Sequence, residues 1–214
     1  MESFRKYEKF TVYDYTLDYV VDFPKDYDPE KKYPVMFYFH GMGGIGQTIE
    51  WLADNAPLRR CRMPEDVPFI LVVPICPDER IWLETFPYVV EFVRHIRAKD
   101  FTDTSRVYLA GSSMGGYTSW MLGVTHPEFF AAATICCGGG LYWAAPRIDF
   151  PVKAFHGAQD PIVLPRESEI MVATIKAAGG NAELIIHEDL SHGVWDRVFT
   201  DPETYYWLLA QKRD

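Results

Sequence analysis

The chain has 214 residues and a formal net charge of −9, enough length for one substantial domain. An acidic balance argues against nucleic acid as the main partner, because phosphate binding needs a basic face. Hydrophobic residues make up 48% and charged residues 24%, and no apolar run is long enough to cross a bilayer. We therefore expect a single domain over residues 1–214 that binds neither nucleic acid nor a membrane.

The N-terminal segment and the cysteines bear on the cellular compartment. The segment MESFRKYEKF lacks the apolar core of a secretion signal. Cys136 and Cys137 are adjacent and poorly placed to pair with each other, whereas Cys61 and Cys76 are free to pair but need not. No C-x-x-C pair is present, so we expect no metal site. These features predict reduced thiols and a cytoplasmic location, or a secreted one if a signal peptide has been removed.

The chain then alternates between strand and helix patterns. Residues Leu17–Phe23 have the alternating pattern of a half-buried strand, and short apolar runs after them are typical of parallel strands buried on both faces. Helical patterns cover residues 89–96, 117–124, 170–178 and 202–212. This alternation predicts an α/β fold with a mostly parallel sheet and helices on both faces. The apolar runs are Val35–Phe39, Phe69–Val73, Val107–Ala110, Ala131–Cys136, Val152–Phe155 and Leu184–Ile186.

Residues 111–115 carry the first chemical signal. They read Gly-Ser-Ser-Met-Gly, a G-x-S-x-G pattern centred on Ser113, between a predicted strand and a predicted helix. A sharp turn there lifts the serine hydroxyl as a nucleophile and forces its neighbours two residues away close together, which favours glycine. A glycine-rich turn without chemistry is the alternative. Ser112 lacks glycine at both flanking positions, so we interpret it as structural.

A nucleophilic serine needs a base and an orienting acid. His192 lies in a loop just past the last predicted strand, where a base could reach over the sheet; a solvated loop histidine is the alternative. Asp160 follows the Val152–Phe155 strand and precedes His192, the order that this kind of sheet requires, although aspartate also caps turns. The less suitable candidates by position are His95, His126, His187, Glu188, Asp189 and Asp196.

The loop His40–Gly44, which follows the strand Val35–Phe39, is glycine-rich and able to present backbone N–H groups. An N–H from Met42 or Gly43, together with that of Met114, would stabilise an oxyanion, each donor contributing about 3–4 kcal/mol. The loop lacks the lysine pattern of a phosphate-binding loop, and no G-x-G-x-x-G pattern is present. We therefore expect neither a nucleotide nor any other cofactor.

The motifs at residues 40–44, 111–116, 135–140, 156–160 and 191–195, with the tail 201–209, resemble the α/β-hydrolase superfamily. The resemblance covers nearly all of the chain from His40 onward. It is nearest to the small lidless serine esterases of the feruloyl-esterase, polyhydroxybutyrate-depolymerase and "predicted peptidase" branch. It implies a single-domain α/β-hydrolase fold, with Ser113 as nucleophile, His192 as base and acid, Asp160 as orienting carboxylate, and Met42 and Met114 as oxyanion donors.

The sequence gives weaker evidence about the substrate. Only residues 138–151 separate two predicted strands, too few for a large cap domain, so we expect an open site. The expected substrate-binding residues are Gly43 and an aromatic wall of Trp82, Trp143 and Trp195, with core packing as the alternative for at least one tryptophan. The sequence thus predicts a serine carboxylesterase that forms an acyl-serine from small-molecule acyl esters, including aryl or feruloyl-type esters. The alternatives are a peptidase, an acyltransferase or a non-catalytic binding protein.

Overall fold

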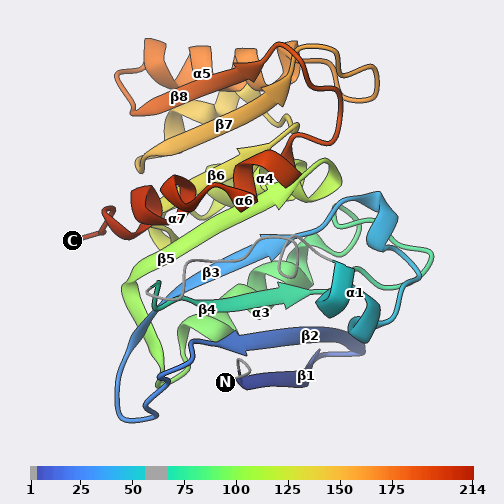
Figure 1. Cartoon of the computed structure of the whole chain (residues 1–214), viewed down its shortest axis with the longest axis vertical. Coiled ribbons are helices and arrows are strands. Elements are labelled where there is room, and N and C mark those ends of the chain that lie inside the picture. Colours follow the sequence, from blue (N-terminus) through green and yellow to red (C-terminus); the bar gives the residue numbers. More distant parts are fainter. Residues whose placement is uncertain (1–3, 56–66) are drawn as a thin grey trace.

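The computed structural model describes residues 4–55 and 67–214, which are built around an eight-stranded sheet (Figure 1). The strand order is β1-β2-β4-β3-β5-β6-β7-β8; β2 is antiparallel to β1 and to β4, and all the other neighbours are parallel. The predicted mostly parallel α/β sheet is confirmed. The strands are β1 (Phe4–Val12), β2 (Tyr15–Phe23), β3 (Tyr33–Phe39), β4 (Ile70–Pro74), β5 (Thr102–Ser112), β6 (Ala132–Cys136), β7 (Val152–Gly157) and β8 (Ala182–His187).

Helices cover both faces of this sheet. One buried cluster joins sheet residues to α3, α4 and α5, and a second joins the opposite sheet face to α1, α6 and α7. In Figure 1, α6 and α7 lie in front of the sheet and α3 lies behind it. None of the described helices is long and apolar enough to span a membrane. The helices are α1 (Ile49–Asn55), α3 (Phe86–Arg97), α4 (Met114–Thr125), α5 (Arg166–Ala177), α6 (Trp195–Thr200) and α7 (Pro202–Leu209), with 3-10 turns η1 (Met42–Gly44), η2 (Pro127–Phe129) and η3 (Tyr142–Arg147).

Strand β3 shows why the apolar runs form central strands. All its residues are buried, with Phe37 and Phe39 in one cluster and Met36 and Tyr38 in the other. Successive side chains of a strand point to opposite faces, so a continuous apolar run fits only where helices cover both faces. The carboxyl ends of β3, β5 and β7 consequently lie along the same edge of the sheet.

The structure adds elements that the sequence patterns miss. Strand β1 is largely exposed, with only Phe10 buried, so no alternating apolar pattern marks it. Strand β2 is buried on both faces at its end rather than half-buried, because α3 packs against it, as Phe92 does against Tyr19, and α1 contacts it as well. The short helices α1 and α6 give too few turns for a visible period, and the last predicted helix ends at Leu209 rather than 212.

No large cap is inserted among the described residues. Between β6 and β7 the chain makes only a loop and the six-residue turn η3. The carboxyl edge of the sheet is therefore open above β5 and β7, as the short segment between the two strands predicts.

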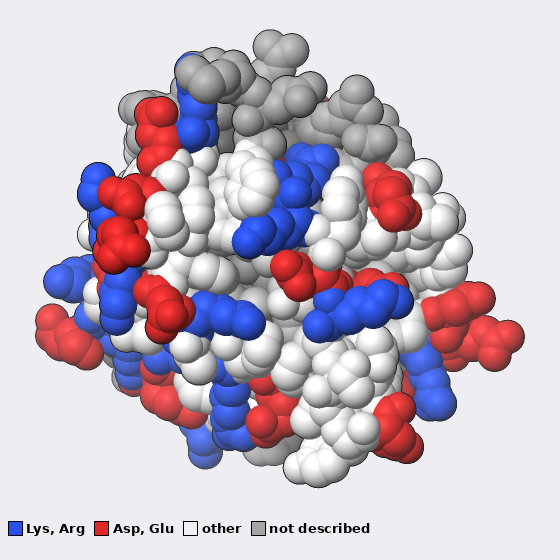
Figure 2. All heavy atoms as spheres, turned by 90° about the horizontal axis from the view of Figure 1, so that it is seen from below, with Lys and Arg blue, Asp and Glu red and all other residues white. Residues whose placement is uncertain are grey.

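Charged side chains of both signs share the face seen from below in Figure 1. Figure 2 shows acidic and basic groups interspersed on the described part of that face. Two ion pairs link β1 to β2, Arg5 to Asp22 at 3.1 Å and Lys9 to Asp18 at 3.3 Å. Although the chain as a whole is negatively charged, this face carries side chains of both signs.

Three of the cysteines are free, buried thiols: Cys76, Cys136 and Cys137. Burial raises the pKa of Cys76 and of Cys137 to about 12, so both thiols stay protonated at neutral pH. Cys61, the partner considered for Cys76, lies outside the described residues.

Candidate active site

Ser113 sits on a sharp turn between β5 and α4. Its backbone has φ 55° and ψ −120°, a left-handed conformation that is uncommon for any residue other than glycine. The Ser113 N–H donates to the Cys136 carbonyl at 3.1 Å, and its carbonyl accepts the Tyr117 N–H at 3.0 Å. Strained conformations persist where the surrounding structure holds them, and they gather at functional sites.

The two glycines of the G-x-S-x-G motif are required by close backbone contacts. A Cβ at Gly111 would lie 2.3 Å from the Gly115 carbonyl oxygen, and one at Gly115 would lie 1.8 Å from that of Phe39. The first turn of α4 therefore packs directly against the ends of β5 and β3. This packing fixes the direction of the Ser113 side chain.

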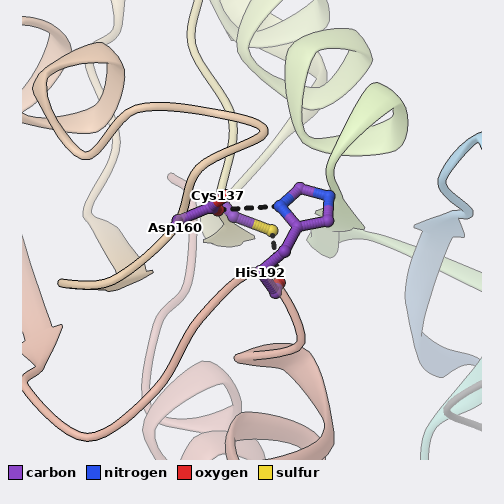
Figure 3. A group of neighbouring side chains, drawn as sticks. All are labelled: Cys137, Asp160 and His192. Atoms are coloured by element: carbon purple, nitrogen blue, oxygen red, sulfur yellow. Dashed lines mark hydrogen bonds and ion pairs between the residues drawn. The ribbon is translucent and has the colours of Figure 1, made fainter.

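The structure brings Ser113, His192 and Asp160 together at the carboxyl edge of the sheet. His192 lies in the loop between β8 and α6, and its Nε2 is 2.9 Å from Ser113 Oγ. Its Nδ1 is 2.7 Å from Asp160 Oδ2, and Figure 3 shows the two side chains pointing toward each other. The geometry fits a neutral imidazole that donates from Nδ1 and accepts the serine proton at Nε2.

Asp160 is held by the loop that follows β7. It is 3% exposed, and its Oδ1 accepts the N–H groups of Ile162 at 2.9 Å and Val163 at 3.0 Å. Burial alone would raise the pKa of Asp160, but the hydrogen bonds from His192, Ile162 and Val163 outweigh it and hold the pKa below its ordinary value. The carboxylate is therefore ionised at neutral pH, as an orienting acid must be.

Two neighbours hold the His192 loop. The Trp195 ring meets the imidazole edge to face, with centroids 5.3 Å apart. The Cys137 thiol donates to the His192 carbonyl at 3.4 Å (Figure 3). Cys137, Asp160 and His192 have the residue types of a metal centre, but in this structure they bond to one another, His192 Nδ1 to Asp160 and Cys137 Sγ to the His192 carbonyl. The cluster fits the orientation of a histidine better than it fits a metal.

The glycine-rich loop after β3 lies beside the serine. A Cβ at Gly41 would be 3.8 Å from Ser113 Oγ, and residues 42–44 form the turn η1. Met42 begins η1 and Met114 begins α4, and N–H groups in a first helical turn have no acceptor within their own helix. Both predicted donors thus begin helical turns next to the nucleophile.

The buried ring of His40 supports this loop through hydrogen bonds. The 4% exposed ring donates from Nδ1 to the Gly41 carbonyl at 2.6 Å and accepts the Cys76 N–H at Nε2 at 2.9 Å. Burial lowers the pKa of His40 to about 4, so the ring is neutral over the physiological range. The carbonyl of His40 accepts the Trp82 indole N–H at 3.0 Å.

A cavity of about 340 Å³ opens beside the serine. Ser113, His192, Gly43 and Trp195 line it, as the sequence predicts for a site. Further lining comes from the exposed side chains of Met42, predicted only as a backbone donor, and of Trp51 and Ile162, which sequence reasoning missed. The signal that could have pointed to Trp51 is its position in the sequence, shortly after the glycine-rich loop.

The structure corrects the position of two predicted wall residues. Trp82 is fully buried against Phe39 and His40 and does not line the cavity, because its indole N–H is engaged by the His40 carbonyl. Trp143, on η3, is 69% exposed and also lies outside the cavity lining. Trp82 is thus a support of the loop after β3 rather than a contact for an acyl group.

The rival candidates have other partners. The Ser112 hydroxyl lies 2.7 Å from that of Tyr38 in the interior, and Asp189 forms a two-pronged ion pair with Arg197. His95 packs against Phe10, and His126 pairs with Glu128. Sequence position alone could not exclude these residues from the catalytic roles, whereas the structure shows that each of them is engaged with another partner.

Comparisons with known proteins agree with this geometry. Residues 83–139 match the model of the prolyl oligopeptidase family. Feruloyl esterase B of Piromyces equi is 25% identical over 166 residues, which cover 68% of this chain and 29% of that protein. A thermostable esterase structure superposes with a TM-score of 0.83 at 26% identity, covering 98% of this chain and 63% of that one. A ferulic acid esterase superposes with a TM-score of 0.73 at 18% identity, covering 97% and 98%.

The strand order, the strained serine turn and these similarities show the fold of the α/β-hydrolases. The named relatives are esterases, and the matching family model is one of peptidases. The chain spans less than a third of the length of its curated relative and about 63% of the thermostable esterase. The fold is thus established, and the reaction is argued from the site.

We expect Gly115→Ala to destabilise the protein by about 3 kcal/mol or more, because the new Cβ meets backbone that cannot move without separating α4 from β3. Urea denaturation measures the change. Gly43→Ala is the matched control, since a Cβ there meets nothing within 4 Å, and it should change stability by less than about 1 kcal/mol. Equal stabilities of the two variants would contradict the close contact.

His40 predicts a pH dependence of stability. The unfolded chain binds a proton at His40 below about pH 6.5, whereas the folded protein does so only near pH 4. Stability therefore falls as the pH drops through this window, by roughly 3 kcal/mol in all from this residue. In His40→Gln the unfolding free energy should fall less steeply between these pH values. His126→Gln, which changes a partly exposed histidine, should keep the wild-type slope; an unchanged slope in His40→Gln would refute the assignment.

Proposed function

We propose that the protein is a serine carboxylesterase that hydrolyses accessible acyl esters through an acyl-serine. The observation that carries the proposal is the hydrogen-bonded series from Ser113 through His192 to Asp160, with distances of 2.9 and 2.7 Å. The esterase relatives support the same reaction class. The strained backbone of Ser113 supports catalysis over mere binding, since a fold without chemistry has no need to hold it.

The proposed reaction follows from the roles of these groups. His192 Nε2 takes the Ser113 proton while Oγ attacks the ester carbonyl, and Asp160 stabilises the imidazolium that forms. The N–H groups of Met42 and Met114 stabilise the oxyanion of the tetrahedral intermediate. His192 returns the proton to the leaving alcohol. Water then repeats the cycle on the acyl-serine and releases the acid.

The cavity supports an aryl or short acyl group as the part of the substrate bound beside Ser113. Its exposed lining is apolar, with Met42, Trp51 and Ile162 around the opening. The name of the Piromyces equi relative supports a feruloyl-type acid. Because no large cap covers the described edge of the sheet, the alcohol portion can be bulky.

Peptide hydrolysis is the second candidate, favoured by the match to the prolyl oligopeptidase family. That match covers residues 83–139, which include α3, β5, the Ser113 turn and β6. These elements build the nucleophile and would serve an ester or an amide equally well. The two reactions are therefore separated by the leaving group.

Ser113→Ala should lower kcat/KM for an aryl ester by at least about 10³-fold while leaving the unfolding transition in place. Ser112→Ala is the matched control, because this neighbouring hydroxyl bonds to Tyr38, and it should keep most of the activity. The measurement compares an ester and an anilide of the same acid. Faster cleavage of the anilide would favour the peptidase, and retention of activity in Ser113→Ala would rule out this nucleophile.

Trp51→Ala should reduce kcat/KM for an aryl-acyl ester roughly tenfold more than for an acetyl ester, because an aromatic contact is lost only with the aryl acid. Trp143→Ala provides the comparison, as this tryptophan is exposed outside the cavity lining. Initial rates over both esters test the proposal. An equal response of the two esters to Trp51→Ala would remove Trp51 from the acyl site.

A further inference from the structure

A second histidine lies beside Asp160, near the same carboxylate oxygen that His192 contacts. His156 belongs to β7, is fully buried, and its Nε2 lies 3.3 Å from Asp160 Oδ2. The side chains of both partners have no exposed area. The proposed reaction gives this imidazole no task, so its protonation state can be examined from its contacts alone.

The first ring nitrogen of His156, Nε2, must carry a proton. His156 Nε2 lies 2.8 Å from the Val163 carbonyl oxygen, which can only accept a hydrogen bond. Asp160 Oδ2, the nearest other polar atom given for Nε2, is also an acceptor. The Nε2 proton is therefore donated to the Val163 carbonyl, and the Asp160 carboxylate lies beside it at ion-pair distance.

The protonation of the second ring nitrogen, Nδ1, follows from its contact with Ser168. His156 Nδ1 lies 2.8 Å from Ser168 Oγ, and that Oγ lies 2.8 Å from the Gly138 carbonyl oxygen. A hydroxyl has one proton, and the carbonyl has none to give. If Ser168 donates to Gly138, Nδ1 must donate to Ser168. If Ser168 donates to Nδ1 instead, two oxygen atoms without a proton between them face each other at 2.8 Å in the interior.

We propose that His156 is held with both ring nitrogens protonated, as a buried imidazolium that pairs with Asp160 and positions it for His192. Only this state satisfies the contacts to Val163, Ser168 and Gly138 together. Buried polar groups in proteins are nearly always hydrogen-bonded, and a buried charge is expected only where it is paired. The positioning role rests on the proposed function, whereas the protonation state does not.

The surroundings favour a cation at this place. The groups that face Asp160 from other elements are His192 in the loop after β8, Cys137 after β6 and Tyr117 of α4. Burial raises the pKa of Cys137 and of Tyr117, so both are neutral at physiological pH. Asp160 is thus the ionised acidic group beside His156, and an imidazolium offsets its field.

The cation has a consequence for catalysis. Asp160 stabilises positive charge on the imidazole of His192, and a fixed positive charge beside the same carboxylate weakens that stabilisation. His156 acts through Asp160 and is a positioning residue.

Nitrogen NMR of the ¹⁵N-labelled protein tests the protonation state without reference to activity. A long-range ¹H–¹⁵N spectrum near neutral pH should give His156 two protonated ring nitrogens, and the partly exposed His126 serves as an internal comparison. The resonances are assigned by their loss in His156→Gln or, if that variant does not fold, by their shift in Ser168→Ala. One protonated and one bare nitrogen at His156 would overturn the proposal.

The pH profile of ester hydrolysis tests the positioning role. In His156→Gln the acid limb of kcat/KM should move to higher pH by about one unit, because a unit positive charge is removed from beside the carboxylate that contacts His192. Ser168→Ala should move it in the same direction. Thr174→Ala is the matched control on α5, as this exposed hydroxyl bonds only within its helix. Reduced stability without movement of the limb would contradict the role, while inactivity of the wild-type protein would fault the proposed function alone.

Discussion

The left-handed backbone of Ser113 is the constraint on which the rest of the site depends. Such a conformation costs about 1–3 kcal/mol, and it persists because the first turn of α4 packs against the end of β3 with no space for a side chain between them. That contact in turn requires β3 and β5 to be adjacent and parallel, which their continuous apolar runs provide. The burial of β3 and β5 therefore stabilises the turn that presents the Ser113 hydroxyl.

The acid side of the site is built separately. Asp160 is fixed by backbone N–H groups of its own loop and lies beside two histidines, of which His192 links it to the Ser113 turn. Ser113 and Asp160 thus depend on different strands, β5 and β7. The loop after β8 must hold one imidazole between them, and Trp195 and Cys137 support it there.

Much of this arrangement can be predicted from the sequence, for identifiable reasons. Strands buried on both faces leave apolar runs, and the glycines around Ser113 mark a turn that few other residues tolerate. The tryptophans could not be assigned in the same way: whether Trp82 or Trp51 faces the cavity depends on the tertiary position of each loop. His156 shows the same limit, because a histidine at the end of a strand gives no sign of its partners. The single domain and the cytoplasmic location stay predictions.

The most direct test of the account is covalent labelling with a fluorophosphonate, followed by mass spectrometry of the modified peptide. If His192 activates the hydroxyl that the strained turn presents, the protein should take up one equivalent of reagent, attached to Ser113. His192→Ala should abolish the reaction while leaving the fold intact. Labelling at another residue, or labelling of Ser113 at an equal rate without His192, would contradict the claim that these side chains form one catalytic unit.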